Sequence, residues 1–236
     1  MTESPRPEVH SLYWANVDPR LLAAQRAVFE HLGIPLQQHL RDRMPHGVWM
    51  DEILAQEPEG IVVFCDIDAV PLRAGPFDRL VARARAGRIA GLAQSCNHLG
   101  NPRHIYAAPM FLALDRGIWR RLGSPSMAAD SEHDAGQRLC IAAEARGVPV
   151  ETVLPSSCLI TIWPLADKRL YGIGTFYGEN DFFHLYQSRK RRFLQAFLQV
   201  CEDVCADRPP DMARYLLTVR PKSRLPKPLR KYFVIS

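Results

Sequence analysis

The stretch Gly60-Ile61-Val62-Val63-Phe64-Cys65-Asp66-Ile67-Asp68 decides the fold of this chain. Its five consecutive apolar residues, 61–65, form the strongest predicted strand in the sequence. A continuous apolar run of this length is typical of a strand that is covered on both faces, as in a parallel sheet. The strand ends abruptly in two aspartates on alternate residues. The sequence therefore predicts a buried strand whose carboxyl end carries two acids.

Predicted strands and helices alternate around this stretch through residue 155. Hydrophobic periodicity predicts strands over 8–14, 34–40, 89–93, 106–114 and 148–154, and helices over 20–32, 46–56, 76–86 and 130–146. Asp18 is a predicted cap for the first helix. The alternation predicts an α/β fold, with a mixed, mainly parallel central sheet flanked by helices. After Cys158 the pattern is irregular, and a long helix over 185–205 follows.

Composition places the chain among globular proteins. It has 236 residues, of which 47% are hydrophobic and 23% charged. No apolar run approaches the roughly 18–20 residues that cross a bilayer, and the first residues lack the pattern of a secretory signal. The six cysteines are scattered and include no CxxC pair, which favours reduced thiols over disulfides or structural zinc. We therefore expect a cytoplasmic protein.

The positive charge is concentrated at the end of the sequence. Residues 208–236 hold eight Lys or Arg and one acid, a charge of +7. Because the whole chain has a net charge of +5, residues 1–207 sum to −2. This distribution argues against a broad nucleic-acid-binding surface. We expect a single domain over 1–207 and a basic, proline-containing arm over 208–236 that is extended or partly ordered. The arm would be solvated, or would contact an anionic membrane surface peripherally.

Two carboxylates at the end of a buried strand are costly unless a positive group lies between them. Ligands of open α/β sheets bind outside the carboxyl ends of the strands. Mg²⁺ or Mn²⁺, held by one or two carboxylates together with substrate phosphates, is the usual solution. The alternative is that Asp66 and Asp68 only cap the following turn. We therefore expect a divalent cation at Asp66 and Asp68.

Two enzyme classes carry a D-x-D at this position. The haloacid-dehalogenase phosphatases use the first aspartate as nucleophile, here Asp66, but they place the motif on the first strand and later supply a Lys and a GDxxxD loop. Lys168 is the only lysine between the motif and Lys190, and no GDxxxD follows. The string from Phe64 to Leu72 and the order of the parts resemble the GT-A glycosyltransferases, which transfer sugars from nucleotide-diphospho-sugars. This resemblance covers roughly residues 8–192.

The resemblance implies a GT-A-like, Rossmann-like domain with a DxD motif and a nucleotide-diphosphate-sugar donor. Asp68 would bind the Mn²⁺ or Mg²⁺ directly, and Asp66 would hold the ribose or the metal through water. Tyr13, Trp14 and Asn16 would lie near the nucleobase, with a place in the core as the alternative for Trp14. The sugar would pass to an unidentified hydroxyl acceptor. A non-catalytic GT-A-like domain that only binds nucleotide or carbohydrate is a further alternative.

A second acidic cluster, from Asp130 to Asp134, opens the helix predicted over 130–146. Helix capping and the helix dipole alone would explain acids at a helix start. In the resembling inverting enzymes, an acid here acts as general base on the acceptor hydroxyl. The match of Asp134, Arg138 and Leu139 to that family's string puts Glu132 in the base position, with Asp130 as the runner-up and Asp134 as a further catalytic candidate.

His184 follows an aromatic pair late in the sequence. Such a histidine is often simply packed, but many GT-A enzymes use a late His to complete the metal site. The spacing from His184 to Lys190 resembles the H-x5-K of glycogenin-like transferases, whose lysine contacts the diphosphate. Any of the basic residues 189–192 is a candidate for that contact. His46 and the polar loop over 97–104 are weaker candidates for the binding site.

Overall fold

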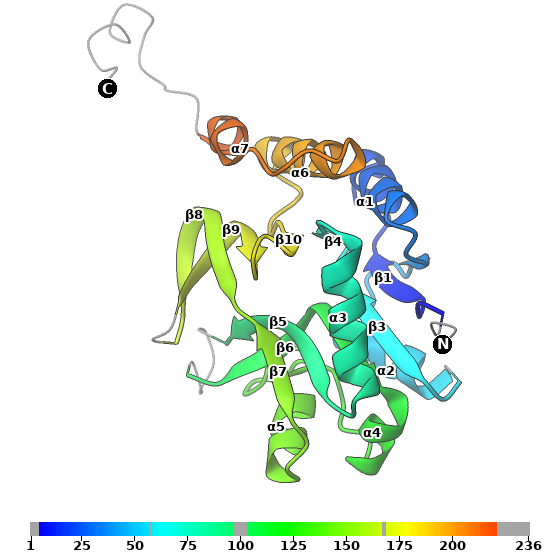
Figure 1. Ribbon diagram of the computed structural model, residues 1–236. Helices are drawn as coiled ribbons and strands as arrows, with labels where there is room; N and C mark the ends of the chain where they lie inside the picture. The colour runs from blue at the N-terminus through cyan, green and yellow to red at the C-terminus, as the bar shows by residue number, and fades with distance from the viewer. Residues whose placement is uncertain (1–4, 57, 97–102, 167–168, 221–236) are drawn as a thin grey trace, which may run out of the picture.

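Two β-sheets and seven helices make up the described part of the chain (Figure 1). The computed structural model describes residues 5–56, 58–96, 103–166 and 169–220. The strands are β1 (Val9–Tyr13), β2 (Leu36–Leu40), β3 (Ile61–Cys65), β4 (Ala69–Pro71), β5 (Ile89–Ser95), β6 (Ile105–Asp115), β7 (Val150–Val153), β8 (Pro155–Leu165), β9 (Arg169–Tyr177) and β10 (Phe182–His184). The helices are α1 (Pro19–His31), α2 (His46–Gln56), α3 (Ala74–Arg85), α4 (Arg116–Arg121), α5 (Gln137–Ala145), α6 (Arg191–Cys205) and α7 (Met212–Val219).

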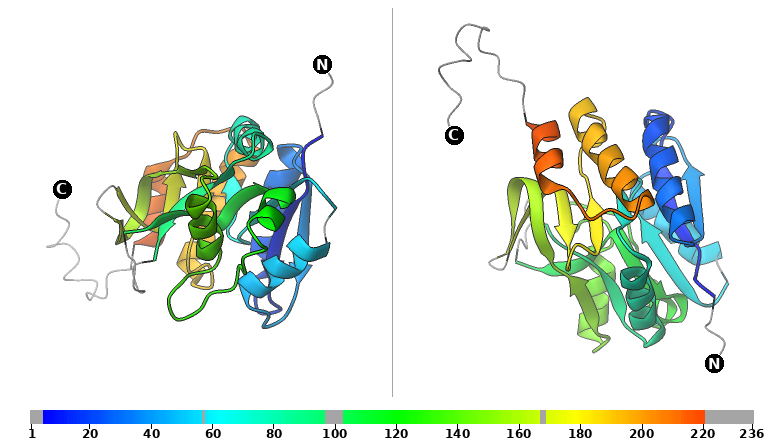
Figure 2. Two further views of the ribbon diagram at one scale, coloured as in Figure 1. Left: turned by 90° about the horizontal axis from the view of Figure 1, so that it is seen from below. Right: turned by 45° about the horizontal axis from the view of Figure 1, so that its top comes forward.

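The larger sheet has the strand order β2-β1-β3-β6-β5-β7. Strand β1 runs parallel to β2 and β3, and β5 runs parallel to β7. Strand β6 is antiparallel to both of its neighbours, β3 and β5. Helices lie on both sides of this sheet (Figures 1 and 2). The predicted mixed, mainly parallel central sheet flanked by helices is confirmed.

Aromatic residues fix the helices to the two faces of this sheet. Phe29 of α1 and Phe77 of α3 pack against Phe111 of β6, with ring centroids 6.4 and 6.2 Å away. On the other face, Trp49 of α2 packs against Phe64 of β3 at 5.5 Å. All five side chains are 1% exposed or less. Burial of each one contributes roughly 1.5–3 kcal/mol, so strand β3 is covered on both faces, as its sequence predicts.

The smaller sheet is antiparallel, with the order β4-β10-β9-β8. Its long β8–β9 hairpin lies in the region after Cys158. The prediction that this region is irregular was therefore wrong. Glycines interrupt the hydrophobic alternation, but one of them permits the pairing. A Cβ at Gly172 would lie 2.1 Å from the carbonyl oxygen of Ile160 on β8. Only glycine allows the two strands to approach this closely.

Two predicted helices begin later than expected. Residues 130–136 form turns rather than the first part of a helix, because the Asp130 side chain accepts hydrogen bonds from local backbone N–H groups and Gly136 has a φ of +76°. Helix α5 therefore begins at Gln137. Helix α6 begins at Arg191 rather than Leu185, because Tyr186 and Gln187 are left-handed, with φ of +53° and +57°.

Of the two alternatives for the basic arm, its first part is ordered rather than extended, because residues 212–219 form helix α7. Asp203 of α6, 3% exposed, accepts hydrogen bonds from Tyr215 and Arg214 of α7 and from Arg208. Burial alone would raise the pKa of Asp203, but these bonds outweigh it and lower the pKa. The rest of the arm, 221–236, lies outside the described residues. No helix within the described ranges is long and apolar enough to cross a bilayer.

Candidate metal centre and binding pocket

The turn after β3 and the short strand β10 bring distant residues together. The Asp66 N–H donates to the Met110 carbonyl at 3.1 Å, and the Asp66 carbonyl accepts from Ala69 at 3.0 Å. This turn leads directly into β4, which pairs with β10 so that Ala69 lies opposite His184. The Asp68 carbonyl accepts from the backbone N–H that follows His184, at 2.9 Å. The backbone itself therefore places His184 beside the two aspartates.

Asp66, Asp68 and His184 form one cluster, in which one potential ligand atom of each residue lies within 4.8 Å of the others. His184 Nε2 is 3.3 Å from Oδ2 of Asp66 and 3.3 Å from Oδ1 of Asp68. The imidazole side chain is 3% exposed, whereas 29% of the Asp66 side chain is exposed. The histidine thus forms the buried back of the cluster, and Asp66 opens towards solvent.

The charges of these groups stabilise one another. Burial would lower the pKa of His184, but its hydrogen bonds to Asp66 and Asp68 and their negative charges outweigh burial and raise the pKa to about 9. Burial would raise the pKa of Asp66, but the hydrogen bond to His184 and the charges of His46 and His184 lower it. At neutral pH His184 is therefore a protonated imidazole that lies between the carboxyl groups of Asp66 and Asp68.

The donor set of the cluster suits a divalent cation. Two carboxylates are ligands that Mg²⁺ and Mn²⁺ prefer, and imidazole is a common ligand of transition-metal ions. His184 Nδ1 is buried and has no hydrogen-bond partner among the described residues. Nε2, in contrast, faces both carboxyl groups, each at 3.3 Å, and is the nitrogen that could bind a metal ion. A cation would take the place of the Nε2 proton and neutralise the same two charges.

A second histidine contacts the other oxygen of Asp66. His46 Nε2 lies 3.5 Å from Asp66 Oδ1, while His184 faces Oδ2. His46 is the first residue of α2, and its ring stacks on Trp49 with centroids 5.5 Å apart. Asp66 is therefore held between two imidazoles. The sequence marked His46 only as a weak candidate, because nothing near it in the chain indicates this partner.

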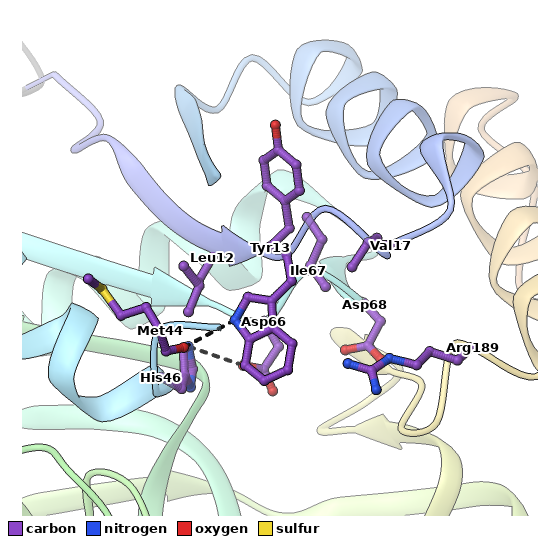
Figure 3. Close-up of a pocket in the computed structure, with 10 residues that line it drawn as sticks. Leu12, Tyr13, Val17, Met44, His46, Asp66, Ile67, Asp68 and Arg189 are labelled. Atoms are coloured by element: carbon purple, nitrogen blue, oxygen red, sulfur yellow. Dashed lines mark hydrogen bonds and ion pairs between the residues drawn. The ribbon is translucent and has the colours of Figure 1, made fainter. Parts of the chain in front are cut away.

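A pocket of about 280 Å³ opens in front of the two aspartates (Figure 3). The residues that line it are Leu12, Tyr13, Trp14, Val17, Met44, His46, Asp66, Ile67, Asp68 and Arg189. Trp14 Nε1 donates to the Met44 carbonyl at 3.1 Å, which fixes the indole in the wall. The guanidinium of Arg189 lies 5.6 Å from the centre of the Trp14 ring. The pocket therefore combines apolar and aromatic walls, two carboxylates and one cation.

Trp14 lines this pocket, whereas Asn16 and Lys190 lie elsewhere. Asn16 is exposed and lines a neighbouring pocket of about 510 Å³, which shares Val17 and Arg189 with the first. Lys190 lines neither pocket, and its Nζ donates to Gln187 at 2.7 Å. Among the basic residues 189–192, Arg189 is the one that reaches the carboxylate pocket (Figure 3).

The three acids of the second cluster have different surroundings. Asp130 accepts hydrogen bonds from the backbone N–H groups of Glu132 and His133 at 2.8 and 2.7 Å, and these bonds lower its pKa. Glu132 is exposed. Asp134 is half-buried and accepts hydrogen bonds from side chains of the larger sheet. Asp134 is therefore the acid of this cluster whose side chain is held in place by residues of the larger sheet.

A series of contacting side chains joins Asp134 to the cluster of Asp66, Asp68 and His184. Oδ2 of Asp134 accepts from Gln94 Nε2 at 2.9 Å and from the Tyr106 hydroxyl at 3.0 Å. Gln94 Oε1 accepts from the Tyr186 hydroxyl at 2.9 Å. The Tyr186 ring packs against His184, with centroids 3.9 Å apart. Sequence reasoning missed Gln94 and Tyr186, because no local pattern connects residues that far apart. Residues 97–102 of the expected polar loop lie outside the described residues.

Comparison with known proteins gives no family for this chain. No protein-family model matches it, and no curated protein matches it. Among solved structures it is similar to A197 from STIV, with 13% identity, a TM-score of 0.43, and coverage of 78% of this chain and 95% of that one. It is also similar to the bifunctional IspDF from Campylobacter jejuni, with 11% identity, a TM-score of 0.40, and coverage of 65% and 50%.

A third similar structure is a putative glucose-1-phosphate thymidylyltransferase from Bacillus anthracis in complex with a sucrose. It has 10% identity and a TM-score of 0.38, over 87% of this chain and 79% of that one. Similarity at this level carries no inference about activity. The structure itself shows a mixed α/β fold that brings Asp66, Asp68 and His184 together, with a pocket lined by the two aspartates.

Proposed function

We propose that this chain is a divalent-metal-dependent glycosyltransferase, which moves a sugar from a nucleotide-diphosphate-sugar to a hydroxyl acceptor. The observation that carries the proposal is the convergence of Asp66, Asp68 and His184, of which the two aspartates line the same pocket as Trp14. A diphosphate would be repelled by two bare carboxylates. Mn²⁺ or Mg²⁺ at the cluster would bind the diphosphate and neutralise the leaving group.

The pocket supplies the other groups that such a donor needs. Trp14 and Tyr13 offer aromatic surface on which a nucleobase can pack. Arg189 lines the same pocket as Asp68, and a guanidinium forms strong, charge-assisted hydrogen bonds with phosphate oxygens. Lys190, expected to make this contact from its spacing, is a second candidate only if its bond to Gln187 opens. Asp66 remains a candidate for the ribose hydroxyls or for the metal.

On the acceptor side, we assign the carboxylate role to Asp134 in preference to Glu132 and Asp130. A general base must accept a proton at a fixed position. Asp134 is held there by Gln94 and Tyr106, whereas Asp130 is engaged by backbone N–H groups and Glu132 is exposed. Asp134 is also the acid of the three that is connected to the metal cluster through Tyr186. These contacts support Asp134 as the residue that orients or deprotonates the acceptor hydroxyl.

A thermal-shift screen of nucleotide diphosphates and nucleotide-sugars, with and without Mn²⁺, tests this proposal. A ligand at 100 times its Kd stabilises the native state by about 2.7 kcal/mol, which raises the Tm of a chain of this size by roughly 5–10 °C. We expect one nucleotide family to give this shift with Mn²⁺ present. Asp68→Ala should abolish it. Asp78→Ala, which removes an exposed carboxylate of α3, is the matched control.

Two other functions make different predictions in the same screen. A haloacid-dehalogenase-type phosphatase would form a phosphoenzyme on Asp66 and would need no nucleotide. A non-catalytic binding domain would show the Mn²⁺-dependent shift but would release no nucleoside diphosphate from the bound donor. If no nucleotide shifts the Tm with any divalent metal, the donor site is wrongly assigned, and labelling of Asp66 by phosphate esters becomes the next measurement.

A further inference from the structure

The side chains of Gln94 and Tyr186 bridge the two halves of the candidate site. Tyr186 follows β10 in the smaller sheet, whereas Gln94 lies on β5 in the larger one. The Tyr186 hydroxyl donates to Gln94 Oε1 at 2.9 Å, and Gln94 Nε2 donates to Asp134 Oδ2 at 2.9 Å. Between the sheets, an uninterrupted polar connection therefore runs from the ring beside His184 to the Asp134 carboxylate.

The direction of these hydrogen bonds is fixed by chemistry. An ionised carboxylate only accepts, so Gln94 must turn its NH₂ group to Asp134. The amide oxygen then faces the Tyr186 hydroxyl, which donates to it at 2.9 Å; the same hydroxyl also lies 3.1 Å from Met110 Sδ, a weaker acceptor. A reversed amide would place two oxygen acceptors, one of them charged, against each other. Because the two bonds are aligned head to tail, each polarises and strengthens the other.

The backbone at Tyr186 is held in an unfavourable conformation. Tyr186 and Gln187 are consecutive left-handed residues, with φ of +53° and +57°. This conformation is costly for residues with a Cβ, and it persists only where surrounding contacts fix it. The Tyr186 ring is fixed by His184 at 3.9 Å and by Trp163 at 5.3 Å, and its hydroxyl by Gln94. Strain at this position, next to the metal ligand, indicates a positioning role.

We propose that Tyr186 and Gln94 are positioning residues that couple the metal ligand His184 to the Asp134 carboxylate. Occupation of the metal site would fix the His184 ring, and the ring would in turn fix Tyr186, Gln94 and Asp134. This inference rests on the proposed metal site. The coupling is a further claim: the metal cluster on the donor side and Asp134 on the acceptor side influence each other through the side chains of Tyr186 and Gln94.

A double-mutant cycle on Mn²⁺ affinity tests the coupling, with Mn²⁺ alone as the probe in calorimetric titrations. The four proteins are the wild type, Asp134→Asn, Tyr186→Phe and the double variant. Asp134→Asn should raise the Kd for Mn²⁺ in both backgrounds. We expect the fold-change in Kd to be about three times larger in the wild type than in the Tyr186→Phe background, which is within the range of couplings between sites. Long-range electrostatic loss is the same in both backgrounds and cancels in this comparison.

Tyr171→Phe is the matched control. Tyr171 belongs to the same aromatic group, with its ring 6.2 Å from that of Tyr186, but its hydroxyl donates to the Ser95 carbonyl. In the Tyr171→Phe background, the effect of Asp134→Asn should stay at its wild-type value. Gln94→Leu breaks the same connection at the next residue and should reproduce the Tyr186→Phe result. The Tm of each variant without metal shows that it is folded.

The outcomes separate the two proposals. If the wild type binds Mn²⁺ and Asp134→Asn has the same effect in both backgrounds, the coupling is refuted and the metal site stands. If the wild type binds no Mn²⁺, with or without a nucleotide diphosphate, the metal site fails and the coupling fails with it. A smaller Asp134→Asn effect in both Tyr186→Phe and Gln94→Leu supports the coupling.

Discussion

The carboxyl end of β3 and the turn at 130–134 both carry acids close together in the sequence, but the fold treats them differently. After β3, Asp66 and Asp68 converge on His184. In the turn, Asp130 is satisfied by backbone N–H groups two and three residues later. In a turn, nearby backbone N–H groups can donate hydrogen bonds to an acidic side chain, whereas few such groups are available at the end of a buried strand. Acids after a buried strand therefore need a positive group from elsewhere, and that group marks the site.

The largest effect expected from this comparison is on turnover. Asp134→Asn should lower kcat by about 10²- to 10⁴-fold, the usual contribution of a positioned general base. Glu132→Gln, which changes an exposed side chain of the same turn, should lower it less than threefold, about 0.6 kcal/mol. Release of nucleoside diphosphate from the donor found by thermal shift measures both. Equal losses of kcat in the two variants would contradict the assignment of the catalytic role to Asp134 rather than Glu132.

A second comparison separates Arg189 from Lys190. Arg189→Ala should weaken binding of the nucleoside diphosphate by about 10- to 100-fold, because a charge-assisted hydrogen bond contributes roughly 1.5–3 kcal/mol. Lys190→Ala should change the affinity by no more than about threefold, because its ammonium lies outside the pocket. Calorimetric titration in the presence of Mn²⁺ measures both. A larger loss in Lys190→Ala would restore the residue expected from the sequence.

The smallest expected effect is on stability as a function of pH, without metal. The pKa of His184 is raised from 6.5 to about 9 by Asp66 and Asp68. Its contribution is therefore complete below pH 6.5 and is lost as pH rises through 9. The urea midpoint of the wild type should fall between pH 7 and about 9.5, and that of His184→Gln should fall less. Equal slopes would mean that His184 is not protonated between the carboxylates.

Much of the fold follows from local sequence patterns. The apolar run 61–65 and the helix over 46–56 have the predicted bounds, and Asp18 caps α1 by accepting from Arg20 at 2.9 Å. The β8–β9 hairpin could not be predicted, because its stability depends on a close approach at Gly172 that hydrophobic periodicity does not record. Helix α7 was missed because its anchor, Asp203, lies on another helix.

The site divides in the same way. Asp66 and Asp68 are evident because a short segment of sequence contains both the buried strand and the acids. His184 could be proposed only from a family resemblance, since its contact with them depends on the pairing of β10 with β4. Gln94 and Tyr186 gave no signal, because each is an ordinary residue until the two sheets are packed. Sequence thus indicated the candidate metal ligands but not the residues that connect them to Asp134.

The most direct test of the metal centre is anomalous diffraction, recorded at the manganese absorption edge, from crystals grown with Mn²⁺ and a nucleoside diphosphate. We expect one strong peak among Asp66, Asp68 and His184, at about 2.0–2.3 Å from the carboxylate oxygens and from His184 Nε2. Asp68→Ala crystals should lack it. A peak elsewhere, or bound nucleotide without a peak at this cluster, would show that Asp66, Asp68 and His184 do not form the metal site.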